Sequence, residues 1–102
     1  MKYNKLVRDK IPEIIRNKDQ IAITHIASDE EYYLKLQEKL KEEVEEFLES
    51  NNNEELADVL EVIYAICDEK GINKEKLEEL RIIKNKERGP FKNRIILDET
   101  NN

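Results

Sequence analysis

The fold of this chain is decided by residues 28–71, which read SDEEYYLKLQEKLKEEVEEFLESNNNEELADVLEVIYAICDEKG. Ser28, followed three residues later by Glu31, forms a capping box, in which the two side chains satisfy free amides at the start of a helix. The apolar residues that follow are spaced for one face of a helix. We expect this helix to run to about Ser50.

Asparagines precede the next two helices. Asn53 is a good N-cap for a second helix, which Gly71 can end by taking the left-handed conformation. Asn73 caps a further helix over residues 74–87. Because the turn at residues 51–53 is short, the first two helices are predicted to form an antiparallel hairpin.

The remaining segments are less regular. Asp9 can cap a short helix that has Pro12 in its first turn and fades near Asn17. Residues 21–26 and 93–97 hold the strand-like runs of the chain, rich in isoleucine. We therefore expect a mainly α fold with a small two-stranded β pairing of 21–26 and 93–97.

The composition bounds the class of protein. A chain of 102 residues has room for a single domain, residues 1–102, and 41% charged residues with only 2 Gly and 2 Pro favour helices with narrow apolar stripes. A net charge of −6 argues against binding to nucleic acid. Apolar runs fall far short of the roughly 20 residues that span a bilayer, and no secretory signal is readable. We expect a cytoplasmic protein that binds neither nucleic acid nor a membrane.

Acidic side chains fall inside the apolar stripe of the first long helix. At about 100° per residue, with Leu36 placed at about 0°, Phe47 lies at about 20° and Glu43 at about −20°. Glu46 lies at the edge of the stripe one turn further on, whereas Glu45 points away to water. This acidic run is therefore not one uniform solvated face.

The second helix carries another acidic pair beside its packed surface. Glu55 and Asp58 are one turn apart, and the hairpin places them opposite the acids of the first helix. Burying one unpaired carboxylate costs several kcal/mol, so such a cluster requires protonation or a cation. Oxygen ligands without nearby His or Cys predict Mg²⁺, with Mn²⁺ as a substitute.

The same acids carry a resemblance to a known family. Residues 42–46, EEVEE, followed by residues 55–58, ELAD, resemble the EExxE and ExxD motifs of the all-α nucleoside triphosphate pyrophosphohydrolases of the MazG superfamily. Residues 5–15, KLVRDKIPEII, and 88–95, RGPFKNRI, resemble its small stand-alone subgroup, which is predicted to clear noncanonical nucleotides in a house-cleaning role.

The resemblance implies Mg²⁺-dependent hydrolysis of nucleoside triphosphates to a nucleoside monophosphate and pyrophosphate. The implied metal ligands are Glu43, Glu46, Glu55 and Asp58. The implied catalytic acids are Glu42, Glu43, Glu46 and Glu61, of which Glu42 or Glu61 would orient or deprotonate the attacking water. The resemblance also implies a homo-oligomer, a dimer or tetramer, in which hairpins of different chains form a four-helix-type bundle.

Basic residues gather near the two ends of the chain. Those inside the family-like motifs are candidates for binding substrate phosphates: Arg8, Lys10, Arg88 and Arg94. For each of them, a solvated base that balances an acidic protein is an equally simple interpretation.

Two other functions stay open at this point. A phosphoribosyl-ATP pyrophosphohydrolase belongs to the same superfamily and would use the same chemistry. In a different class, the chain would be a non-enzymatic acidic helical interaction module with exposed carboxylates and a partner on its apolar helix. A response to Mg²⁺ separates the enzymes from the module.

Overall fold

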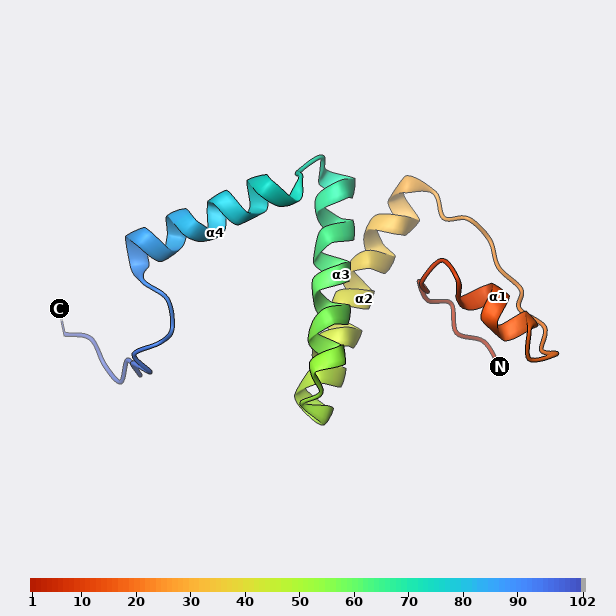
Figure 1. Cartoon of the computed structure of the whole chain (residues 1–102), viewed down its shortest axis with the longest axis horizontal. Coiled ribbons are helices and arrows are strands. Elements are labelled where there is room, and N and C mark those ends of the chain that lie inside the picture. The colour runs from red at the N-terminus through yellow and green to blue at the C-terminus, as the bar shows by residue number, and fades with distance from the viewer. Residues whose placement is uncertain (102) are drawn as a thin grey trace.

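The computed structural model describes residues 1–101, which form four helices joined by turns and irregular segments (Figure 1). The helices are α1 (Ile11–Arg16), α2 (Asp29–Ser50), α3 (Asn53–Lys70) and α4 (Lys74–Arg88). The fold is therefore mainly α, as the composition predicts. In this described part of the chain, no helix has the length and apolar character needed to cross a membrane.

Local sequence signals account for three helix ends. The Ser28 hydroxyl accepts a hydrogen bond from the Glu31 amide at 3.2 Å, which confirms the predicted N-cap of α2. The second half of the predicted capping box does not form, because the Glu31 carboxylate lies 2.8 Å from Nε2 of His25 instead. The Asn73 side chain accepts from the Lys76 amide at 2.8 Å at the start of α4. Gly71 ends α3 with a φ of 74°, a left-handed conformation that glycine adopts without a steric penalty.

Ser28→Ala is expected to lower the free energy of unfolding by about 1 kcal/mol, because the Glu31 amide loses its acceptor. Urea denaturation measures the change. Ser28→Thr serves as the control, since it keeps a hydroxyl at the cap and should retain most of the stability. Equal losses in the two variants would contradict the role given to this hydrogen bond.

Two helix starts differ from the prediction by one residue. The N-cap of α1 is Lys10, because Asp9 and Lys10 form a turn that leads into the helix. The N-cap of α3 is Asn52, and Asn53 is already helical. Asn51 takes a left-handed φ of 57°, which reverses the chain quickly enough for α3 to begin one residue early.

The predicted β pairing is wrong. Residues 21–26 and 93–97 hold no strand, although their isoleucines favour one. The two segments lie toward opposite ends of a chain whose longest extent is 61 Å (Figure 1), so neither offers its backbone to the other. Ile21, Ile23 and Ile95 are all exposed, which shows that β-branched composition alone did not supply a partner for strand hydrogen bonds.

The core lies between α2 and α3, which pack against each other and run in opposite directions (Figure 1). Leu36 of α2 is only 1% exposed, and Val62 and Cys67 of α3 are also buried. α1 and α4 lie on either side of this pair, away from each other. The α2–α3 pair is therefore the packed frame of the described chain.

The chain as a whole is extended. Its radius of gyration is 18.2 Å, against about 13 Å for a compact domain of this length. Its accessible surface is 9695 Å², against roughly 6,000 Å² for a compact protein of this size. Part of the excess is apolar, and exposed aliphatic side chains lie along α3 and α4: Leu56, Leu60, Leu80, Ile82 and Ile83.

Candidate metal centre

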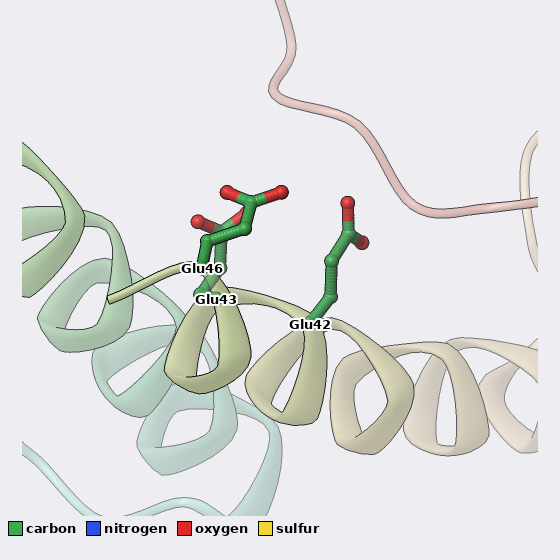
Figure 2. Close-up of side chains that lie close together, drawn as sticks. All are labelled: Glu42, Glu43 and Glu46. Carbon is green, nitrogen blue, oxygen red and sulfur yellow. The ribbon is translucent and has the colours of Figure 1, made fainter. Parts of the chain in front are cut away.

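Carboxylates from α2 and α3 converge in the frame formed by the two helices. Glu43, Glu55 and Asp58 each place a carboxylate oxygen within 4.8 Å of the others. Glu42, Glu43 and Glu46 form a second such group along α2 (Figure 2). Glu43 belongs to both groups, and the two groups together are called the acidic cluster. The four ligands expected from the sequence are divided between them: Glu46 shares a group with Glu43 and Glu42, and Glu55 and Asp58 share the other with Glu43.

Glu43 is the centre of this acidic cluster and is only 5% exposed. Its Oε1 lies 3.1 Å from the Nζ of Lys39, but its Oε2 is buried without a hydrogen-bond partner. The Oε2 of Glu55 is also buried without a partner. Because an unsatisfied buried carboxylate oxygen costs several kcal/mol, two of them in one cluster indicate a place that suits a cation.

The electrostatics of Glu43 agree with its position. Burial raises the pKa of the Glu43 carboxyl above its ordinary 4.5, and the charges of Glu46 and Asp58 raise it further. Lys39 opposes this shift without cancelling it. The neighbouring negative charges therefore disfavour the ionised form of Glu43, and a divalent cation would relieve that repulsion.

The pKa of Glu42 is shifted in the opposite direction to that of Glu43. Burial alone would raise its pKa, but the hydrogen bond from Lys5 and the charge of Lys39 hold the pKa of Glu42 below 4.5. Glu42 is therefore ionised at neutral pH. The lowered pKa also makes Glu42 a weaker base than an ordinary glutamate, so it is better suited to accept a hydrogen bond from a water than to take its proton.

The chemistry of the donors selects the type of cation. Both groups consist of carboxylates, with neither His nor Cys among them. Oxygen ligands of this kind suit hard cations such as Mg²⁺ and Mn²⁺. The residues present thus fit the ion expected from the sequence.

The N-terminal segment crosses the acidic cluster and places two bases on it. Nζ of Lys5 lies 3.0 Å from Oε1 of Glu42, and Nη2 of Arg8 lies 2.6 Å from Oδ1 of Asp58. Figure 2 shows the trace of this segment passing opposite the carboxylates of α2. Of the four predicted phosphate-binding bases, Arg8 is thus placed directly at the cluster.

The other three predicted bases form no ion pair with the cluster within residues 1–101. They are Lys10, Arg88 and Arg94. α4 and the C-terminal segment lead away from the α2–α3 pair (Figure 1). Glu61, the other candidate for orienting water, is exposed on α3, and its charge adds to the Asp58 hydrogen bond in raising the pKa of Arg8.

The sequence interpretation missed two lysines that contact the cluster. Lys39 lies four residues before Glu43, a spacing that brings side chains together on a helix, so this contact could have been found. Lys5 contacts Glu42 across 37 positions of sequence. The sequence contains no local signal for that pairing.

Comparisons with known proteins do not add a family assignment. No protein-family model, curated protein or solved structure matches this chain. The class of site is therefore defined by the geometry alone: an all-carboxylate centre between two helices, with bases from the N-terminal segment at its edge.

Proposed function

We propose that this chain is a Mg²⁺-dependent nucleotide pyrophosphohydrolase of the MazG type, which releases pyrophosphate from nucleoside triphosphates, damaged ones in particular. One observation carries the proposal. The buried Oε2 atoms of Glu43 and Glu55 lack hydrogen-bond partners inside a cluster made only of carboxylates. The EExxE and ExxD motifs that supply these residues also resemble those of the superfamily.

Each acid has a proposed role. The ligands of the cation are four residues: Glu43, Glu46, Glu55 and Asp58. A bound divalent cation would neutralise phosphate charge and lower the pKa of its water. Glu42 would orient or deprotonate the attacking water, because it lies beside Glu43 and Glu46 in the acidic cluster, and Glu61 is the alternative for this role. Arg8 would contact a substrate phosphate.

The proposal includes a homo-oligomer. Two or four copies would pair their α2–α3 hairpins into a four-helix-type bundle, with the described chain as one protomer. The extended shape and the exposed aliphatic side chains of α3 support this, because a chain of this size needs a second apolar surface to cover them.

Pyrophosphate release is the direct test of this function. The substrates are standard and damaged nucleoside triphosphates together with phosphoribosyl-ATP, each with Mg²⁺, with Mn²⁺ and with EDTA. We expect release from damaged triphosphates that EDTA abolishes. Release from phosphoribosyl-ATP alone would identify the alternative pyrophosphohydrolase. No release, together with melting that ignores both cations, would favour the acidic helical interaction module.

A further inference from the structure

We propose that Arg8 substitutes for the divalent cation at Asp58 and is transferred from this carboxylate to an anionic substrate group when the cation binds. The proposal rests on the metal centre described above and adds a control step to it. Arg8 would then pair with Asp58 in the absence of the cation and with a substrate anion in its presence.

The contacts place Arg8 and the cation in competition for one carboxylate. Nη2 of Arg8 lies 2.6 Å from Oδ1 of Asp58. Asp58 also belongs to the group in which one carboxylate oxygen each of Glu43, Glu55 and Asp58 lies within 4.8 Å of the others. Arg8 therefore neutralises one of the three carboxylates, while Oε2 of Glu43 and Oε2 of Glu55 remain unpaired. A divalent cation could serve all three at once.

The exposure of Arg8 allows the exchange. Its side chain is 56% exposed, and ion pairs at exposed positions contribute little to stability. A cation that binds several carboxylates together should displace such a contact. The guanidinium would then lose its partner and regain its ability to bind another anion.

The rest of the N-terminal segment is held in place independently of Arg8. Lys35 of α2 donates a hydrogen bond to the carbonyl of Asn4 at 2.6 Å, and Lys5 pairs with Glu42 at 3.0 Å. These two contacts keep the segment on α2 when the Arg8 contact breaks. The freed guanidinium would stay beside the centre, where it can form paired hydrogen bonds with a phosphate.

Binding of Mn²⁺ alone tests the competition, with no nucleotide present. We expect Arg8→Gln to bind Mn²⁺ about two- to fivefold more tightly than the unmodified chain, as the loss of one exposed competing ion pair implies. Lys10→Gln is the matched control, because it removes one positive charge two residues away. It should bind Mn²⁺ as the unmodified chain does.

The guanidinium itself provides a second readout. In ¹⁵N NMR spectra, the side-chain signal of Arg8 should move toward that of a free arginine when Mg²⁺ is added. It should move again when inorganic triphosphate follows. Without Mg²⁺, inorganic triphosphate should have a much smaller effect, because Asp58 still holds the guanidinium.

The outcomes separate this proposal from the proposed function. Tighter Mn²⁺ binding by Arg8→Gln and a Mg²⁺-dependent shift of the Arg8 signal would support the exchange. Equal Mn²⁺ affinities with an unmoved Arg8 signal would overturn the exchange and leave the metal centre intact. No Mn²⁺ binding by either chain would overturn the metal centre, and with it both proposals.

Discussion

Glu43→Gln is expected to lower Mg²⁺-dependent pyrophosphate release at least about 100-fold, as direct removal of a metal ligand should cost no less than loss of a supporting group. Glu43 is the carboxylate that both acidic groups share, so its loss disrupts each of them. Glutamine keeps the size of the side chain and removes its charge. Initial rates at saturating Mg²⁺ measure the effect.

The same substitution should have opposite effects on stability with and without the cation. Burial raises the pKa of Glu43, so the folded state binds this proton more tightly than the unfolded chain does. Above the folded pKa the ionised carboxylate therefore lowers stability, and this cost fades as the pH falls through that pKa. Glu43→Gln removes the cost at neutral pH, so the cation-free variant should melt at a higher temperature than the unmodified chain.

Addition of Mg²⁺ should reverse that order. At a Mg²⁺ concentration of about 100 Kd, the unmodified chain should gain roughly 2.7 kcal/mol through binding to the folded state. Glu43→Gln should gain little at the same concentration. In thermal melts, Glu43→Gln should therefore have a higher melting temperature than the unmodified chain in EDTA and a lower one in Mg²⁺. A general change in the fold would shift the melting temperature in the same direction under both conditions.

Glu45→Gln is the matched control for these measurements. Glu45 lies on the same helix, loses the same charge and is exposed. It is absent from both acidic groups in the described chain. Its activity and its response to Mg²⁺ should stay close to those of the unmodified chain. Equal losses in both variants would show that the total charge of α2, and not the position of Glu43, controls the activity.

The contrast between Glu43 and Glu45 shows what the sequence could predict. The helical repeat predicts the direction of both side chains: Glu43 lies with Leu36 in the apolar stripe, and Glu45 points toward water. The structure agrees, since Glu43 and Leu36 are buried and Glu45 is exposed. The caps at Ser28 and Asn73 were predictable for the same reason, because each depends on residues within one helical turn.

Contacts between distant residues were not predictable in this way. The motif at residues 5–15 made Arg8 a candidate for phosphate binding, but nothing in the sequence indicates that Lys5 and Arg8 lie against Glu42 and Asp58. The strand expected at residues 21–26 does not form, for a related reason. β-branched residues favour an extended backbone, but a strand also needs a neighbouring strand to pair with, and only the fold can provide one. Local sequence preferences thus determine where the helices form, whereas the path of the N-terminal segment places Lys5 and Arg8 at the acidic cluster.

Leu60→Asp is expected to break the proposed oligomer and to produce the largest loss of stability among the predicted substitutions. Leu60 and Leu56 of α3 are 46% and 48% exposed in the single chain. If the chain were a monomer, a change at such a surface position would fall within about 0.5 kcal/mol. In a bundle of hairpins the new charge would be buried without a partner, which costs several kcal/mol.

Light scattering and thermal melts across a wide range of protein concentrations distinguish these cases. The unmodified chain should have the mass of a dimer or tetramer and a melting temperature that rises with concentration, because association stabilises the folded protomer. Leu60→Asp should be monomeric and melt well below it. Leu60→Ala is the graded control: it loses apolar area but buries no charge, so it should weaken the assembly less. If all three chains were monomers with similar melting temperatures, the exposed face of α3 would not be an oligomer interface, and the α2–α3 pair would have to fold without it.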